Sequence, residues 1–276
     1  MTEAREGSDN RSELVEKSLA KDDLHQQWGG EYLSDENEKL FDLVFDCIAQ
    51  VLNAPSQATI LDAGAGSCVH AIRLAKRGFL VRGVDFSDAA LETGRSNIEK
   101  QNVKEKVTMQ KGTILSLPFE DESFEYVICW GVLMHVPEIE TAIKELARVT
   151  KPGGKLVIGE NNMNSLECII VRTFKKIFKK KESRISRSAS GIEYWNESSA
   201  GPYLYRDANI NWMIGEFNEL GFDLEKRMPS QFTEIFVHLP TAFVKKFVHW
   251  FNRFWLKFVK IPYVATGNVL FFQKRI

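Results

Sequence analysis

The sequence predicts an α/β fold, in which helices cover both faces of a doubly wound, mostly parallel sheet of seven strands. Two observations lead to this prediction. From residue 59 onward, short apolar runs typical of buried strands alternate with amphipathic helical patterns, and a glycine turn joins the first run to the first helix. Such alternation favours parallel strands, because each crossover helix covers one face of the sheet. The 276 residues, of which 44% are hydrophobic, suffice to bury such a core.

The individual elements follow in a regular order. Apolar residues at helical spacing predict a first helix over 36–52, which ends before Pro55. Apolar runs predict strands at 59–63, 80–86, 106–112, 124–131, 155–160, 221–227 and 267–274. Helical patterns occupy 70–76, 88–100, 138–150 and 207–220. Between the fifth and sixth strands, the basic, serine-rich residues 165–200 predict a helix followed by a mobile loop.

Composition divides the chain into two parts. Residues 1–35 are polar, and we expect a partly disordered segment there that closes over a bound ligand. Residues 36–276 are expected to form one domain, with its core at 58–160 and insertions at 165–206 and 230–262. The N-terminus lacks the apolar core of a signal sequence, and no apolar run reaches the ~18 residues of a membrane span. We therefore expect a cytoplasmic protein, which in one interpretation lies on the inner face of a membrane.

Charge and cysteine spacing narrow the classes of partner. The formal net charge of −1 gives no overall attraction to nucleic acid. Residues 172–187 nevertheless hold eight Lys or Arg and one Glu, and residues 235–276 hold seven Lys or Arg and no acid. These segments have amphipathic patterns and no aromatic-basic strand module for RNA, so nucleic acid is not the expected partner. The four cysteines form no C-x-x-C pair and no Cys/His cluster of metal-ligand spacing, so we expect reduced thiols and no metal site.

The glycine turn after the first strand predicts a nucleotide site. Gly64 and Gly66 match the start of the dinucleotide pattern G-x-G-x-x-G, but Val69 stands at its third glycine. Asp85 ends the second strand, 19 residues after Gly66. A carboxylate there can accept hydrogen bonds from both ribose hydroxyls of an adenosine ligand. The alternative is that Asp85 only caps a turn.

Four segments, in this order and spacing, carry a resemblance to a known family: "ILDAGAGSC" (60–68), "VRGVDFSDAALE" (81–92), "GTILSLPFEDESFEYVICWGVLMHV" (112–136) and "ELARVTKPGGKLVIGE" (145–160). Together they resemble the class I S-adenosylmethionine-dependent methyltransferases, over residues 58–160 and more loosely toward the C-terminus. The resemblance implies a Rossmann-like fold, S-adenosyl-L-methionine as cofactor and transfer of its methyl group.

The resemblance also implies roles for the residues at the ends of the first two strands. Asp62 would orient the methionine portion of the cofactor. Gly64 and Gly66 would let the backbone approach that portion closely, because a Cβ would collide with it. Asp85 would hold the ribose, and Phe86 would pack on the adenine face.

Further residues of the resemblance follow the third and fourth strands. Gly112, Thr113 and Ile114 would border the adenine edge, and Trp130 would line the pocket. Many relatives carry Asp where Thr113 stands, and a hydroxyl is a weaker acceptor than a carboxylate. Cys68 replaces the third glycine of the loop and is expected to narrow it.

Methyl transfer from a sulfonium chiefly requires alignment and exclusion of water, and a general base only where the acceptor must lose a proton. His135, just past the fourth strand, is the candidate base, or else a structural residue of that turn. Glu160 and Asn161 follow the fifth strand and either contact the acceptor or cap the next helix. In the N-terminal segment, Tyr32 reaches the methionine carboxylate, or Trp28 and Tyr32 merely anchor the segment on the core.

The segment 241–260 has an aromatic stripe at helical spacing: Phe243, Phe247, Trp250, Phe251, Phe254, Trp255 and Phe258. Lysines and Arg253 fill much of the remaining positions, and no acid is present. Three interpretations remain: with 172–187, the helix binds an anionic membrane surface; it covers the acceptor cleft; or it forms a dimer interface. The sequence does not determine the oligomeric state.

These observations predict a methyltransferase that acts on an O or N atom of a small-molecule acceptor, in one interpretation lipid-linked or part of an envelope glycan. The alternative is a catalytically degenerate protein of the same fold that serves as a binding or interaction module, suggested by Thr113 and Cys68. A nicotinamide-dependent oxidoreductase is disfavoured by the missing third glycine and by "KPGGKLVI" (151–158).

Overall fold

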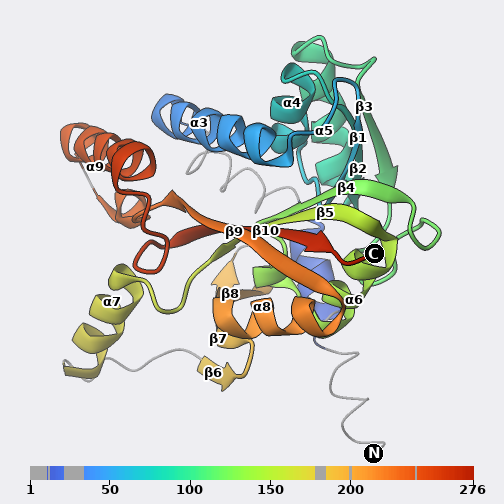
Figure 1. The fold of residues 1–276 in the computed structure, drawn as a ribbon. Coiled ribbons are helices and arrows are strands. Elements are labelled where there is room, and N and C mark those ends of the chain that lie inside the picture. The colour runs from blue at the N-terminus through green and yellow to red at the C-terminus, as the bar shows by residue number, and fades with distance from the viewer. Residues whose placement is uncertain (1–10, 12, 22–33, 178–184, 199–200, 240) are drawn as a thin grey trace, which may run out of the picture.

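The computed structural model describes residues 11, 13–21, 34–177, 185–198, 201–239 and 241–276. Its main sheet has seven strands in the order β3-β2-β1-β4-β5-β10-β9 (Figure 1). Neighbours from β3 to β5 are parallel, whereas β10 is antiparallel to both β5 and β9. The strands are β1 (Thr59–Ala63), β2 (Leu80–Asp85), β3 (Val107–Lys111), β4 (Phe124–Trp130), β5 (Thr150–Asn161), β9 (Phe222–Gln231) and β10 (Gly267–Lys274). The predicted fold class is confirmed.

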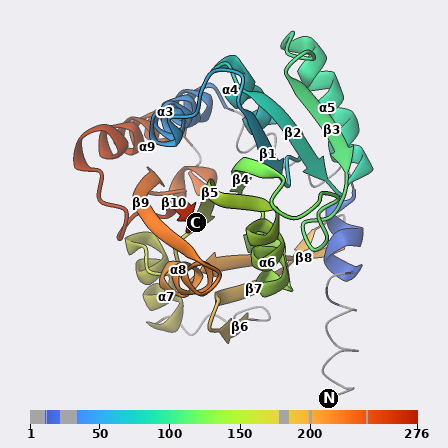
Figure 2. The same ribbon diagram turned by 45° about the vertical axis from the view of Figure 1, so that its right-hand side comes forward.

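Helices cover both faces of this sheet. Figures 1 and 2 show α3, α4 and α5 on one face and α6 and α8 on the other. Successive residues of a strand point to opposite faces, so Ile60 joins the core beneath α3 and α4, and Leu61 joins the core beneath α6 and α8. The helix bounds are α3 (Asp35–Leu52), α4 (Val69–Lys76), α5 (Asp88–Lys100), α6 (Ile139–Val149), α7 (Leu166–Ile177), α8 (Ile210–Glu219) and α9 (Ala242–Phe254).

Residues 185–208 correct one prediction. In place of a loop, β6 (Ile185–Ser188), β7 (Gly191–Ser198) and β8 (Gly201–Ala208) form a three-stranded antiparallel sheet. The bridge from Asn162 to Ala208 joins this small sheet to the segment that leaves β5. Helix α8 consequently begins at Ile210, later than predicted, with the side chain of Asn209 accepting a hydrogen bond from the amide of Trp212.

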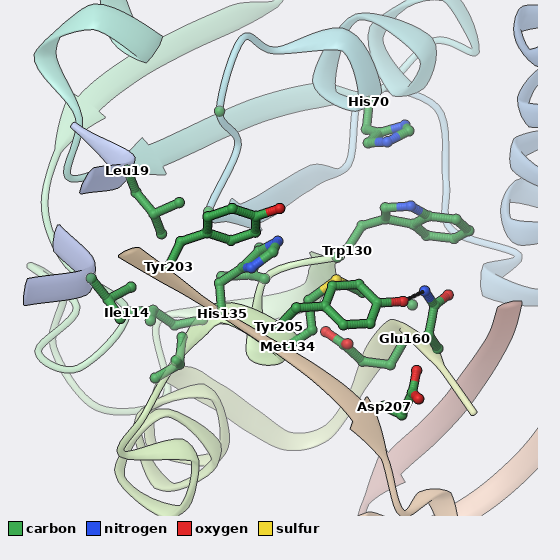
Figure 3. Close-up of a pocket in the computed structure, with 18 of the residues that line it drawn as sticks. Leu19, His70, Ile114, Trp130, Met134, His135, Glu160, Tyr203, Tyr205 and Asp207 are labelled. Carbon is green, nitrogen blue, oxygen red and sulfur yellow. Dashed lines mark hydrogen bonds between the residues drawn. The ribbon is translucent and has the colours of Figure 1, made fainter. Parts of the chain in front are cut away.

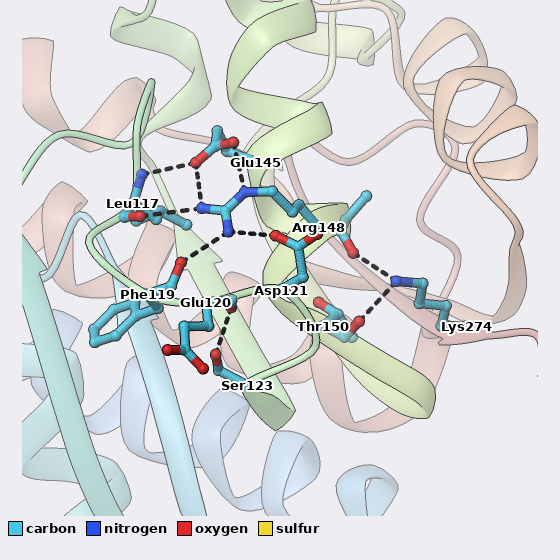
Figure 4. A network of polar contacts seen from close by, with 10 residues as sticks. Leu117, Phe119, Glu120, Asp121, Ser123, Glu145, Arg148, Thr150 and Lys274 are labelled. Carbon is cyan, nitrogen blue, oxygen red and sulfur yellow. Dashed lines mark hydrogen bonds and ion pairs between the residues drawn. The ribbon is translucent and has the colours of Figure 1, made fainter.

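Arg148 of α6 fixes the connection from β3 to β4 (Figure 4). Its guanidinium donates to the carbonyls of Leu117 and Phe119 at 3.0 and 2.8 Å and pairs with Asp121 at 2.9 Å. Glu145 receives two further bonds from Arg148 and accepts from the amide of Leu117 at 2.8 Å. These contacts hold in place the segment that carries Gly112 to Ile114.

The carboxyl ends of the parallel strands meet at one edge of the sheet, where doubly wound folds bind ligands. The small sheet and α7 adjoin this edge, as does the N-terminal helical turn over 13–19, whose Val15 and Leu19 pack beside Leu204 of β8. Within the described residues, none of the helices has the length and apolar composition that a membrane span requires.

Candidate functional site

A cavity of about 1460 Å³ opens at the carboxyl edge of the sheet. Pockets for one small ligand usually measure ~300–1000 Å³, so this cavity has room for two molecules. The wall has two halves: the turns after β1, β2 and β3 form one, and β7, β8, α7 and the segment after β9 form the other. Among the described residues, no group of three or more His, Cys, Asp or Glu side chains could hold a metal ion.

The glycine turn after β1 forms part of the first half. Gly64 has a φ of +85°, and a Cβ there would lie 2.4 Å from Cγ2 of Val132. Gly66 has a φ of +51°, and no heavy atom lies within 4 Å of the position its Cβ would take. Gly64 is therefore required by packing, whereas the backbone at Gly66 is open to the close approach of a ligand.

Asp85 braces this turn from the end of β2. One carboxylate oxygen accepts from the amide of Gly66 at 2.8 Å, and the other accepts from the amide of Ser87 at 2.9 Å. Asp85 is 8% exposed and lines the cavity. A carboxylate has about four lone-pair sites, so a side chain of this kind can brace the turn and also accept from a ligand diol.

Two residues of the turn do not reach the cavity wall. Asp62 is buried at the end of β1, and burial, with the nearby charge of Asp85, raises its pKa to about 7. The carboxyl oxygen Oδ2 of Asp62 has no hydrogen-bond partner among the described residues. Cys68 is buried with φ +64°, and its Sγ contacts Sδ of Met109 at 2.7 Å. The expectation that Cys68 narrows the loop is wrong, because the thiol points into the core.

The predicted adenine-side residues do meet at the cavity. Phe86, Gly112, Thr113 and Ile114 all line it, and Phe86 packs beside the buried Val15 and Leu19. The Thr113 hydroxyl oxygen accepts from the amide of Leu115 at 3.3 Å. The described part of the N-terminal segment thus contributes to the wall, whereas Trp28 and Tyr32 lie outside the described residues.

Trp130 closes the wall beside α4. Its ring centroid lies 5.4 Å from that of His70 and 6.2 Å from that of Phe41. Burial, together with the charge of Arg73, lowers the pKa of His70 to about 3, so this imidazole is neutral at pH 7. The sequence analysis missed His70; its signal was its place in the first turn of the helix that follows the glycine loop.

His135 lies where the two halves meet, on the short 3-10 turn η1 (Leu133–His135) after β4. Figure 3 shows its ring close to Tyr203 and Tyr205, and the ring centroids lie 6.4 and 6.3 Å away. Its Nδ1 lies 2.7 Å from the carbonyl oxygen of Leu204. Since a carbonyl can only accept, we assign the proton to Nδ1, which makes Nε2 the basic nitrogen.

The second half of the wall is rich in hydroxyl and carboxyl groups, most of them missed by the sequence analysis. Glu160 and Asn161, the two candidates predicted after the fifth strand, both line the cavity, and Asn161 donates from Nδ2 to the Tyr205 hydroxyl at 2.6 Å. Glu160 accepts from the amide of Leu133 at 2.9 Å. Burial raises the pKa of Glu160 to about 8 and that of Glu234 to about 7, and it also raises the pKa of Asp207. The small sheet brings the tyrosines and Asp207 to the cavity. Its strands were not recognised in the sequence, because they follow and partly lie within a basic, serine-rich segment.

Comparison with known proteins relates this site to a family. Residues 61–158 match the family model described as a methyltransferase domain. The demethylmenaquinone methyltransferase of Bacillus subtilis strain 168 is 32% identical over 120 residues, which are 42% of this chain and 51% of that protein. A ubiquinone biosynthesis O-methyltransferase of Alkalilimnicola ehrlichii is 36% identical over 123 residues, 44% of this chain and 49% of that protein. The match therefore spans about half the length of these curated relatives.

A solved structure extends the likeness over most of the chain. The crystal structure of magnesium protoporphyrin IX methyltransferase from Synechocystis PCC 6803 with bound SAH covers 94% of this chain and 97% of its own, with a TM-score of 0.62. The two sequences are 14% identical, so this likeness concerns the fold.

Proposed function

We propose that this chain, whose residues 61–158 form a methyltransferase domain of the class I fold, transfers the methyl group of S-adenosylmethionine to an oxygen or nitrogen atom of a small-molecule acceptor. One observation carries the proposal. A single cavity of about 1460 Å³ has the glycine turn and Asp85 on one half of its wall, the hydroxyl and carboxyl groups on the other, and His135 where the two halves meet. Two reactants held in such a cavity are aligned for a direct transfer.

The chain's residues fit this cofactor. The open backbone at Gly66 suits the methionine end, and Asp85 suits the ribose diol. Phe86 and the Gly112–Ile114 segment offer an apolar slot for adenine. Asp62 acts from behind the turn, where its oxygen Oδ2, which has no hydrogen-bond partner in the part of the chain that the structure describes, favours a nearby cation. When bound, the cofactor supplies a methyl group on a positively charged sulfur, which is already an activated leaving group.

His135 is the proposed general base for a hydroxyl acceptor. The bond to Leu204 holds the imidazole in one orientation and leaves Nε2 as the nitrogen that accepts a proton. In the same turn as His135, the amide of Leu133 donates a hydrogen bond to Glu160. This bond fixes the position of the Glu160 carboxyl group relative to the turn that carries His135. An amine acceptor that is already neutral would not require this proton transfer.

Two kinds of observation support a small-molecule acceptor. The cavity half beside His135 is lined by Tyr194, Tyr203 and Tyr205, whose rings pack flat groups while their hydroxyls form hydrogen bonds. The names of the two curated relatives, demethylmenaquinone methyltransferase and ubiquinone biosynthesis O-methyltransferase, also point to small organic acceptors.

The test compares Asp85→Asn with the matched control Asp88→Asn. Asp88 lies three residues away, is exposed and, among the described residues, forms an ion pair with Lys111 alone. Loss of charge-assisted bonds at Asp85 is expected to raise the Kd for S-adenosylmethionine about 10- to 100-fold, measured by isothermal titration calorimetry. The control should stay within about 2-fold of wild type, because removing an exposed ion pair changes little.

The same proteins are then incubated with methyl-labelled cofactor and a cell extract. Label that enters the lipid or the soluble small-molecule fraction with wild type and Asp88→Asn, and not with Asp85→Asn, supports the proposal. Cofactor binding without transfer to any fraction would favour the catalytically degenerate alternative. A wild-type protein that binds no cofactor would overturn the site itself.

A further inference from the structure

Helix α9 turns part of its aromatic stripe away from the protein. Phe243 is 83% exposed, Phe247 58% and Trp250 51%. The face turned inward carries His249, 3% exposed, and Asn252, which is completely buried. An amphipathic helix of a monomeric domain normally buries its apolar face, so three aromatic rings that are each more than half exposed are unusual.

Polar contacts hold α9 in this orientation. The Asn252 side-chain oxygen accepts from the amides of Phe232 and Thr233, both at 3.1 Å, and its nitrogen donates to the carbonyl of Thr233 at 2.9 Å. Arg253 pairs with Glu36 of α3. Of the aromatic stripe, Phe251 and Trp255 also help to attach the helix, because their rings pack against Phe232 at centroid distances of 5.2 and 4.4 Å. No described residue of α9 lines the cavity, so the interpretation in which the helix covers the acceptor cleft is not supported.

Helix α7 repeats the arrangement. None of its residues is buried, and its apolar side chains include Phe174, 58% exposed, and Ile177, 66% exposed. On another side, α7 lines the cavity with Cys168, Val171 and Arg172. The same helix thus borders the cavity and exposes an apolar surface.

The segments that lead into α7 and α9 are held next to each other by strand pairing and by hydrogen bonds. Gly267 of β10 pairs with Asn161 and with Gln231, the residues that end β5 and β9 and precede the two helical segments. Glu167, in the first turn of α7, accepts from the Thr233 hydroxyl at 2.6 Å and from the Glu234 amide at 2.9 Å. Both views show α7 and α9 projecting from the same side of the molecule (Figures 1 and 2).

The charged residues of α9 and of the turn after it are all positive, and Glu36 of α3, which lies beside them, is paired with Arg253. Lys246, Lys257 and Lys260 are exposed, Lys176 is exposed on α7, and no acid occurs from residue 235 to the end of the chain. We propose that the outer faces of α7 and α9 form a docking surface for an anionic phospholipid membrane. Aromatic side chains enter the interface, and lysines meet the headgroups.

Charge decides between this partner and a second copy of the chain. A two-fold dimer through α9 would bring the same lysines of both copies together without an acid between them, which costs energy. An anionic headgroup layer neutralises the same lysines. The inference goes beyond the proposed function, because it places the cavity beside a lipid surface. Vesicle binding is measured without cofactor, so each of the two proposals can fail while the other holds.

The experiment measures sedimentation of the full chain with vesicles. Vesicles of mixed phosphatidylcholine and phosphatidylglycerol are compared with vesicles of phosphatidylcholine alone. Wild type is expected to bind the anionic vesicles, and added salt should weaken the binding. Phe247→Ala/Trp250→Ala should lower the partition coefficient at least about 10-fold, because two interfacial aromatics are lost.

Two further variants make the outcome specific. Leu224→Ala/Ile276→Ala removes exposed apolar side chains at the other end of β9 and at the C-terminus, and it should bind like wild type. Lys246→Glu/Lys257→Glu should lower binding to anionic vesicles only. The inference is overturned if the wild-type protein does not bind anionic vesicles. It is equally overturned if the Phe247→Ala/Trp250→Ala variant binds them as strongly as wild type. If the wild-type protein is a dimer and the Phe247→Ala/Trp250→Ala variant is a monomer that binds vesicles like wild type, the exposed rings form a dimer interface and the inference is overturned.

Discussion

Arg206 offers the sharpest test of how the small sheet supports the site. Its side chain on β8 is 1% exposed and donates to the carbonyls of Leu133 and Val136 at 2.8 and 2.9 Å. It also pairs with Glu193 of β7 at 2.7 Å. The two carbonyls flank His135, so Arg206 joins the turn of the candidate base to the small sheet. The perturbation is Arg206→Met, which keeps a long apolar stem and removes the guanidinium.

The expected cost follows from what the substitution leaves behind. The carbonyl of Val136 loses the Arg206 donor, at about 1–3 kcal/mol, whereas the carbonyl of Leu133 still accepts from the amide of Val136 at 3.2 Å. Among the described residues, Glu193 keeps Arg11 and Ser186 as partners. Breaking a buried ion pair from one side costs about 3–5 kcal/mol in proteins, and we expect a loss of this size in the free energy of unfolding. Arg11→Met is the matched control, because Arg11 pairs with the same carboxylate but is 44% exposed, which predicts about 0–1 kcal/mol.

Urea unfolding followed by circular dichroism measures both variants, and calorimetry measures their affinity for S-adenosylmethionine. Affinity should stay within about 3-fold of wild type, because Arg206 lies outside the glycine turn. A cost for Arg206→Met no larger than that for Arg11→Met would refute the reasoning.

The ion pair between Arg206 and Glu193 also makes the stability depend on pH. Burial alone would raise the pKa of Glu193, but bonds from Arg206 and Arg11 hold it below its usual value. This stabilisation is therefore present above the unfolded pKa and is lost as the pH falls through the folded value.

Two further predictions concern the cavity. Glu160 has its pKa raised from 4.5 to about 8 by burial, so the folded protein retains a proton that the unfolded chain releases, and stability falls as the pH rises between these values. Glu160→Gln should reduce this loss by roughly 3–5 kcal/mol between pH 5 and pH 9 in urea titrations, and an unchanged decline would contradict the assignment. His135→Gln should lower the rate of labelled methyl transfer to a hydroxyl acceptor about 10²- to 10⁴-fold with little change in cofactor affinity, whereas a rate within about 3-fold of wild type would remove His135 as the base.

Local patterns predicted the core elements well. The bounds of β1, α5 and β10 agree with the prediction, because buried strands and a capped helix leave their signal within a few residues of sequence. Residues 185–208 were missed, because a short antiparallel sheet depends on pairing between segments rather than on a local period. Its strands follow a lysine-rich stretch, which favoured a solvated loop.

The candidate site divides in the same way. Gly64, Gly66 and Asp85 were predicted from the turns at strand ends, and Phe86 and the segment Gly112–Ile114 from the family resemblance. The parallel topology brings all of them to one cavity. Tyr203, Tyr205 and Asp207 come from β8, whose position depends on buried contacts such as Arg206 with Leu133. No spacing in the sequence indicates such a contact, because the partners lie 73 residues apart.

The sequence by itself determined the fold class, the glycine turn and the carboxylate that braces it, since each depends on residues close together in the chain. It also determined that α9 has an aromatic stripe among lysines. Only the tertiary structure decided which way that stripe faces: Asn252 bonds to backbone groups just after β9, Phe251 and Trp255 pack against Phe232, and Phe243, Phe247 and Trp250 are left facing outward. The tertiary structure likewise decided that Asp62 lies behind the turn, because β1 is covered on both faces and its last side chains are buried.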